Sequence, residues 1–403
     1  MTTADSTPVG PAPVWDVING FASYWALSAA LDLGLFDALA KDADSGNGLD
    51  AAQLATAIGA AGPGPVTVLA ETLVALDLLA AEGDRFRLTP VAERYLVSTA
   101  PASMAALVRY SPGPQAAWPG LADTVRTGAP EPSVAAELTD LYPALVRATG
   151  PTQSGVATAV AAELERRAWW PRRPTVVDLG CGSGAWLTAL LRTRPHGTVI
   201  AVDLPHVLPI AERAATDAGL RGQVVAVPGD YLDAALPVAT ADVVVLAHVL
   251  RAEPPERARK LLTRAVELAG ADGVVVVVDY ARPDPATASH HDSGGTGDGD
   301  TSHGGTGDIG TRDIGTRDIG TRDIGTGGDD RTAVCASARH ELLLSLTMLA
   351  STAGLGVTVA DLRAWAEAAG AELVDSFEPV PRQHVRLIRS RTRSRTRTPE
   401  ATS

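Results

Sequence analysis

Cysteine and aromatic residues are scarce in this chain of 403 residues. It has two cysteines, Cys181 and Cys335, and aromatic side chains make up 4% of the sequence. Two cysteines so far apart indicate neither a disulfide framework nor a metal-binding cluster. Because hydrophobic residues still make up 45%, alanine and valine must provide much of the core packing. The length predicts two domains with additional segments.

Long apolar runs and positive charge are also lacking. The longest β-like apolar run, Val274 to Val278, is far too short to cross a bilayer. The N-terminus has no basic region followed by an apolar stretch, so no signal peptide is expected. The net charge of −13 disfavours a general nucleic-acid-binding function. We therefore expect a cytoplasmic protein with no membrane partner and no specific nucleic-acid partner.

A glycine-rich turn between an apolar run and a helix is the most informative segment. The run Val176-Val-Asp-Leu-Gly-Cys-Gly-Ser-Gly184 leads into Ala185-Trp-Leu-Thr-Ala-Leu-Leu191. This order predicts a strand, a tight loop and a helix, which together bring backbone N–H groups close to a ligand. Nicotinamide and flavin sites begin in a similar way. However, the spacing Gly180-x-Gly182-x-Gly184 differs from the G-x-G-x-x-G of a dinucleotide fold.

Acidic residues also end the strands that follow. Thr198-Val-Ile-Ala-Val202 leads to Asp203, which is well placed to bind two ribose hydroxyls. Pro228-Gly-Asp-Tyr231 forms another acidic strand end, and Asp242-Val-Val-Val-Leu246 predicts a fourth strand. Strands and helices alternate from residue 174 to 283, which predicts a parallel sheet with helices on both faces.

Residues 14–100 predict a small helical domain with a β-wing, similar to a winged helix. Apolar residues recur at helical spacing from Phe21 to Leu35, and Asp50 begins a second helix. A third helix is expected over Val66 to Leu79, followed by an alternating strand, Arg85-Phe-Arg-Leu-Thr89. DNA binding is the alternative to a packing role. The third helix, however, has no Arg or Lys to contact phosphates.

Two further segments of low complexity are predicted to be disordered. Residues 286–332 contain a repeat that begins with Asp308-Ile-Gly-Thr-Arg312, and such a composition cannot bury enough apolar area to fold. A calcium-binding β-roll is the alternative, but its repeat has nine residues and this one has five. Residues 389–403 form an arginine-rich tail. Weak contact of this tail with nucleic acid or an acidic surface remains an alternative.

Helical and strand patterns fill the rest of the chain. Residues 101–170 predict a helical connector with four inward-facing side chains, Trp118, Leu121, Tyr142 and Leu145. Helices are expected from Glu341 and from Val359, and a terminal β-hairpin from Glu372 to Phe377 and from His384 to Ile388. These last segments extend the predicted catalytic domain, which covers residues 171–285 and 333–388.

In their order and spacing, these motifs resemble the dimeric small-molecule O-methyltransferases of bacterial natural-product pathways, relatives of the caffeate-type enzymes. The resemblance also rests on Ala29-Ala-Leu-Asp-Leu-Gly-Leu-Phe-Asp-Ala-Leu39 and Val202-Asp-Leu-Pro205. It implies an α/β fold, with a Rossmann-like class I methyltransferase catalytic domain. It also implies an N-terminal all-helical, winged-helix-like dimerisation domain. The segment Phe21 to Leu39 is apolar over more than one helical face, which favours a homodimer.

The resemblance implies S-adenosylmethionine (SAM) as the cofactor. The implied cofactor-binding residues are Asp178, Gly180, Gly182, Asp203, Leu204, Gly229, Asp230 and Tyr231. The first three would approach the methionine portion, Asp203 would bind the ribose, and Leu204 would lie beside the adenine. The segment from Gly229 to Tyr231 would hold and cover the adenine. Helix capping is the alternative role for the acids.

The chain departs from this family at the catalytic base. A gapless alignment of residues 242–256 places Arg251 at the position of the family's histidine, and Ala252 and Glu253 replace the next two residues of its His-Asp-Trp triplet. An arginine cannot accept a proton near neutral pH, but it can stabilise an oxyanion. Asp279 matches a position that is commonly Glu.

Two more positions bear on catalysis. The segment Leu355-Gly-Val-Thr358 has no carboxylate where the family often carries an acid. His248 would share a helical face with Arg251 if a helix began there, although packing is the more ordinary role at that position. The candidate catalytic residues are therefore Arg251, His248 and Asp279.

The expected function is SAM-dependent methylation of a small aromatic or polyketide-type intermediate of secondary metabolism, such as antibiotic biosynthesis. O-methylation is expected, or C- or N-methylation of an activated acceptor, because alignment alone can suffice for a nucleophilic acceptor. The alternatives are a SAM-binding protein that catalyses a non-methylating rearrangement or pericyclic step, and a non-catalytic dimeric member of the family.

Overall fold

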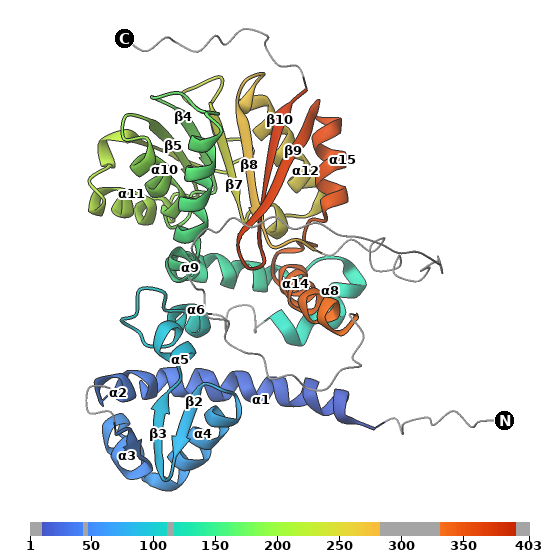
Figure 1. The fold of residues 1–403 in the computed structure, drawn as a ribbon. Coiled ribbons are helices and arrows are strands. Elements are labelled where there is room, and N and C mark those ends of the chain that lie inside the picture. Colours follow the sequence, from blue (N-terminus) through green and yellow to red (C-terminus); the bar gives the residue numbers. More distant parts are fainter. Residues whose placement is uncertain (1–9, 43–46, 111–116, 283–330, 392–403) are drawn as a thin grey trace, which may run out of the picture.

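The computed structural model describes residues 10–42, 47–110, 117–282 and 331–391. They form a small N-terminal domain and a larger α/β domain, with helix α9 between them (Figure 1). Most of the predicted insertion at 286–332 and of the predicted tail at 389–403 lies outside the described residues.

The N-terminal domain is helical with a small sheet. Its elements are α1 (Ala12–Asp32), α2 (Leu35–Asp42), β1 (Leu49–Asp50), α3 (Ala51–Ile58), α4 (Pro63–Ala75), β2 (Leu79–Glu82), β3 (Arg85–Leu88) and α5 (Pro90–Tyr95). The helix start at Asp50 is confirmed, because its carboxylate accepts hydrogen bonds from the N–H groups of Ala52 and Gln53. Helices α3 and α4 together reach the length and apolarity of a membrane span, but they meet at a bend of 103°, and no single described helix does so.

The strand predicted at Arg85–Thr89 is confirmed as β3, but the description of the N-terminal domain as all-helical is wrong. Strands β1, β3 and β2 form an antiparallel sheet in that order, and Leu49 pairs with Phe86. The side chain of Phe86 is buried in the core with α2, α3 and α4, which fixes the sheet to the helices. Strand β1 has only two residues, too few to show the alternation that reveals a strand in sequence.

The connector is helical, as predicted. It contains α6 (Ala105–Tyr110), the 3₁₀ turn η2 (Trp118–Gly120), α8 (Leu121–Thr127) and α9 (Pro132–Arg166). Helix α9 packs against α6 and also against α10 (Ala185–Thr193), so it joins the two domains. Of the four side chains predicted to face inward, Trp118, Leu121 and Leu145 are partly buried, and Tyr142, 38% exposed, lines the cavity described below.

Seven of the described strands form one sheet in the order β6-β5-β4-β7-β8-β10-β9. They are β4 (Thr175–Leu179), β5 (Thr198–Asp203), β6 (Val224–Pro228), β7 (Val243–Ala247), β8 (Val274–Asp279), β9 (Ala371–Val380) and β10 (Gln383–Ser390). The first five in this order are parallel, as predicted, and β9 and β10 form the predicted antiparallel hairpin. The boundary at 388 is wrong, because Arg389 pairs with Glu372 and Ser390 with Ala371.

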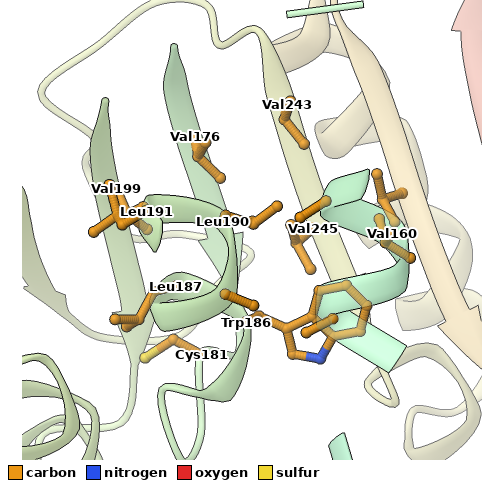
Figure 2. Packing of buried hydrophobic residues seen from close by; sticks show 14 of the residues in the cluster. Val160, Val176, Cys181, Trp186, Leu187, Leu190, Leu191, Val199, Val243 and Val245 are labelled. Carbon is orange, nitrogen blue, oxygen red and sulfur yellow. The ribbon is translucent and has the colours of Figure 1, made fainter. Parts of the chain in front are cut away.

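Helices cover both faces of this sheet. Helices α9, α10 and α11 (Leu208–Asp217) pack on one face, and α12 (Pro255–Ala269) and α15 (Val359–Ala368) pack on the other. Figure 2 shows Trp186, Leu187 and Leu190 of α10 facing valines of the strands, among them Val199 and Val245. Valine therefore provides much of the core, as the composition predicts.

The strand order reverses direction at β4. The chain runs from β4 to β5 and β6 on one side of β4, and then crosses to β7 on its other side. In open α/β sheets, ligands bind at the carboxyl ends of the strands beside such a reversal. Helix α14 (Arg331–Thr352) lies at this edge, next to the 3₁₀ turn η4 (Leu250–Ala252) that follows β7 (Figure 1). The turn η3 (Arg221–Gln223) precedes β6.

Candidate active site

The glycine loop after β4 has the tight geometry that its sequence predicts. Gly180, Gly182 and Gly184 have φ angles of 86°, 48° and 76°, which are unfavourable for residues with a side chain. A Cβ atom at Gly180 would come within 2.6 Å of the side chain of Val249. The loop therefore needs glycine both for its backbone conformation and for its close packing.

Asp203 lies at the end of β5 and is held beside this loop. Its side chain is buried and accepts hydrogen bonds from the N–H groups of Gly182 (2.8 Å) and Leu204 (2.7 Å). Burial raises the pKa of Asp203, and these two backbone hydrogen bonds oppose that effect. The carboxylate is thus fixed in position while Leu204, next in the chain, remains partly exposed.

Asp178, near the end of β4, is completely buried. Neither of its carboxyl oxygens has a hydrogen-bond partner among the described residues. Burial, and to a lesser extent the charge of Asp203, raises the pKa of Asp178 to about 8. A buried acid without a partner is costly, which indicates that a ligand group completes its interactions.

Asp230 and Tyr231, at the end of β6, belong to a network of hydrogen bonds with Glu253 and Arg257. Arg257 donates to Asp230 (2.9 Å) and to Glu253 (2.6 Å), and the Tyr231 hydroxyl donates to Glu253. Burial opposes the charge of Asp230, but hydrogen bonds from Leu232 and Arg257 outweigh it and lower the pKa. Burial and the hydrogen bond to Glu253 raise the pKa of Tyr231, so its hydroxyl stays protonated.

A cavity of about 400 Å³ opens between these strand ends and α14. Its lining residues come from α9, η4, α12, α14 and the carboxyl ends of β4, β5 and β6: Tyr142, Gly180, Asp203, Leu204, Gly229, Asp230, Tyr231, Ala252, Glu253, Arg257, Ser351 and Thr352. A wider surface groove of 820 Å³ lies between α9, α10 and α11, but the acidic strand ends do not line it. We therefore take the smaller cavity as the candidate cofactor site.

The chemistry of this cavity fits SAM. Asp203, Asp230 and Glu253 place three carboxyl groups on the cavity wall, and Arg257 supplies one positive charge. Asp178 is buried two residues before Gly180, which also lines the cavity. SAM carries a sulfonium and an ammonium, both cationic, and two ribose hydroxyls that donate to a carboxylate. The unpartnered Asp178 would hold the ammonium, and Asp203 would hold the ribose.

The three candidate catalytic residues meet beside this cavity. Asp279 is buried at the end of β8, with its carboxylate 3.3 Å from Arg251 Nε and 3.7 Å from His248 Nδ1. It also accepts from the N–H groups of Arg251 (3.2 Å) and Tyr280 (2.9 Å). His248 does not share a helix with Arg251, because it adopts a φ of 60° and the turn η4 begins at Leu250.

Arg251 is largely buried and pairs with Asp279. Its guanidinium lies 4.9 Å from the ring centre of Tyr280, and its side chain is 19% exposed. Nη1 is buried and has no hydrogen-bond partner among the described residues. Arg251 thus keeps a donor that could bind an acceptor oxygen, and this role remains a prediction.

Several residues of the site had only weak signals in the sequence. Tyr142 lies far from the motifs along the chain, whereas Arg257 directly follows the aligned segment 242–256 but had no predicted role. Burial raises the pKa of Tyr142, and the charge of Asp203 adds to this shift. Ser351 and Thr352 come from the end of α14, whose place at the sheet edge only the tertiary structure determines.

Comparison with known proteins agrees with this geometry. The O-methyltransferase domain family matches residues 156–294, and the O-methyltransferase dimerisation domain family matches residues 15–98. The N,N-dimethyltransferase OxyT of Streptomyces rimosus is 32% identical over 300 residues, covering 72% of this chain and 85% of its own length. The 3-hydroxy-5-methyl-1-naphthoate 3-O-methyltransferase of Streptomyces sahachiroi is 29% identical over 290 residues, covering 69% and 81%.

A solved structure shows the same fold. Human N-acetylserotonin methyltransferase in complex with SAM superposes with a TM-score of 0.68 at 22% identity, covering 96% of this chain and 99% of that one. The fold and the site define a class I SAM-dependent methyltransferase. The chain belongs to the O-methyltransferase family with an N-terminal dimerisation domain.

Proposed function

We propose that this methyltransferase acts on a small aromatic or polyketide-type natural product, in a pathway such as antibiotic biosynthesis, whose acceptor atom is already nucleophilic. The proposal rests on the gapless alignment that assigns Arg251 to the position of the family's base, and it is supported by the pairing of the Arg251 side chain with Asp279. An arginine cannot remove a proton from the acceptor at neutral pH. An acidic phenol, an electron-rich carbon or an amine needs no such base.

The cofactor supplies an electrophilic methyl group when bound. In the favoured reaction the acceptor oxygen enters as an anion, its lone pair forms the O–CH₃ bond, and the S–CH₃ bond breaks to leave a neutral thioether. No proton then has to be removed by the protein. Arg251 would donate from Nη1 to the acceptor oxygen, while Asp279 would hold Nε and fix the guanidinium.

A non-methylating reaction is the second candidate, and the same unpartnered donor of Arg251 favours it. A guanidinium that binds a substrate carbonyl can polarise it for a rearrangement or a pericyclic step. The cofactor would then bind without being consumed. A non-catalytic member of the family would show neither product.

Incubation with methyl-labelled SAM and a panel of aromatic acids, phenols and amines tests the proposal. We expect labelled product and an equal amount of S-adenosylhomocysteine (SAH) with at least one acidic or amine acceptor. A converted substrate without SAH would favour the second candidate. No product with any acceptor, despite measured SAM binding, would favour the non-catalytic alternative.

We also propose that the enzyme works as a homodimer built by its N-terminal helices. Apolar side chains of α1 are exposed along much of its length, and Phe21 is 71% exposed while Ala30 and Leu31 are buried. An apolar face of this kind fits a second copy of the chain. Obligate interfaces of this type usually bury more than about 2,000 Å². The dimerisation-domain match supports this reading.

A further inference from the structure

Arg386 in β10 is a buried cation whose guanidinium has no hydrogen-bond or ion-pair partner among the described residues. Only 5% of the residue is exposed, and its buried Nε has nothing to donate to. Burial lowers the pKa of Arg386, and the charge of Asp279 opposes this shift. Arginines are rarely buried to this extent without an anion beside them.

The register of the sheet places Arg386 near the candidate catalytic residues. In the pairing of β10 with β8, Arg386 lies opposite Val277 and His384 lies opposite Asp279. Because side chains two residues apart point to the same face of a sheet, Arg386 and Asp279 share the face covered by α12 and α15. Arg251 reaches the same carboxylate from η4.

Asp279 cannot neutralise both arginines. Its carboxylate already serves Arg251 Nε and two backbone N–H groups, those of Arg251 and Tyr280. The nearby loop Leu355–Thr358 contributes no carboxylate. Glu341, another buried acid of this region, acts electrostatically on His340 and His384. Among the described residues, Asp279 is the carboxylate that acts on Arg386, and it is already paired with Arg251. One carboxylate therefore serves two guanidinium groups.

We propose that Arg386 and Arg251 form a subsite for a carboxylate of the acceptor. The proposal rests on the proposed function and adds the substrate class, an aromatic hydroxy acid. The subsite adjoins the cofactor cavity, because Ala252 and Glu253, which follow Arg251, line it. A carboxylate accepts charge-assisted hydrogen bonds from both guanidinium groups and supplies the anion that Arg386 lacks.

Binding of a matched pair of ligands tests the subsite. We suggest 3-hydroxy-2-naphthoate and its neutral amide, 3-hydroxy-2-naphthamide, titrated into the enzyme saturated with SAH. The wild type should bind the acid at least tenfold more tightly than the amide. Arg386→Met should remove this preference by weakening the acid alone, and Arg386→Lys should keep part of it. Arg391→Met is the control, because Arg391 is exposed just beyond β10, and it should change neither affinity.

The melting temperature of Arg386→Met distinguishes a ligand-binding role of Arg386 from a purely structural role. If Arg386 awaits a ligand, Arg386→Met removes an uncompensated buried charge, and the melting temperature without acceptor should stay equal or rise. A lower melting temperature together with equal loss of acid and amide binding would overturn the proposal. Equal affinity of the wild type for acid and amide would also overturn it, while SAH binding would leave the proposed function standing. Failure to bind SAH would refute the proposed function itself.

Discussion

Replacement of Asp178 by asparagine should change how the stability of the cofactor-free enzyme depends on pH. Asp178 is fully buried without a partner, and its pKa rises from 3.8 to about 8. Between these values the folded protein keeps the proton and the unfolded chain loses it. The folded state is therefore favoured at low pH, and this contribution is lost as pH rises from about 4 towards 8.

The size of the effect follows from the shift. Each pH unit inside this window lowers the free energy of unfolding by up to about 1.4 kcal/mol. Between pH 5 and pH 7 the wild type should lose about 2.5 kcal/mol through Asp178 alone. Asp178→Asn has no charge to lose and should lack this component. Asp203, whose pKa is also raised, remains in both proteins, so the difference isolates Asp178.

Urea unfolding at pH 5, 6 and 7, with and without saturating SAH, measures this difference. SAH carries an ammonium group, so its binding should lower the pKa of Asp178 and reduce the pH dependence of the wild type. Asp217→Asn is the control, because Asp217 is an exposed partner of Arg213 and should leave the slope unchanged. Parallel pH dependence in the wild type and in Asp178→Asn would refute the reasoning.

Four further variants test the cofactor site, the acceptor site and the interface. Asp203→Ala should weaken SAM binding by about 1.5–3 kcal/mol, because a charge-assisted contact is lost; unchanged affinity by calorimetry would contradict its role. Arg251→Ala should slow methyl transfer about a hundredfold or more at unchanged SAM affinity. Full activity of this variant would refute the proposed role of Arg251 as a donor to the acceptor oxygen. Arg251→His should allow methylation of a weakly acidic phenol, measured with labelled SAM. Phe21→Asp combined with Trp25→Asp should give a monomer by light scattering, where the native protein should give a dimer.

The central sheet could be predicted from sequence because its signals are local. Buried parallel strands read as continuous apolar runs, and each of the first three ends in an acid or a glycine turn. The small strand β1 could not be predicted in this way, since it consists of two residues held by their pairing with β3. The end of β10 was set too early because arginines continue past Ile388 while the pairing with β9 continues to Ser390.

The residues of the candidate site were likewise predicted only where the signal is local in the sequence. The acids at strand ends were found because position in a strand is visible in the sequence. Arg257 and Arg386 were not, since their importance depends on which carboxylates lie beside them in space. For Arg386 a signal existed: a charged residue stands in the otherwise apolar part of His384-Val-Arg-Leu-Ile388, where the neighbouring residues are buried. Only the structure revealed that its buried Nε has no hydrogen-bond partner in the part of the chain that the structure describes.

Calorimetric titration of SAM and SAH into the wild-type protein tests the central claim most directly. The account predicts that both ligands bind with one site per chain, in the cavity that Asp203, Tyr231 and Glu253 line. Binding should release a proton near pH 7, because the ligand ammonium would stabilise the charged form of Asp178. The absence of binding heat at any temperature and of protection against thermal unfolding would contradict the account.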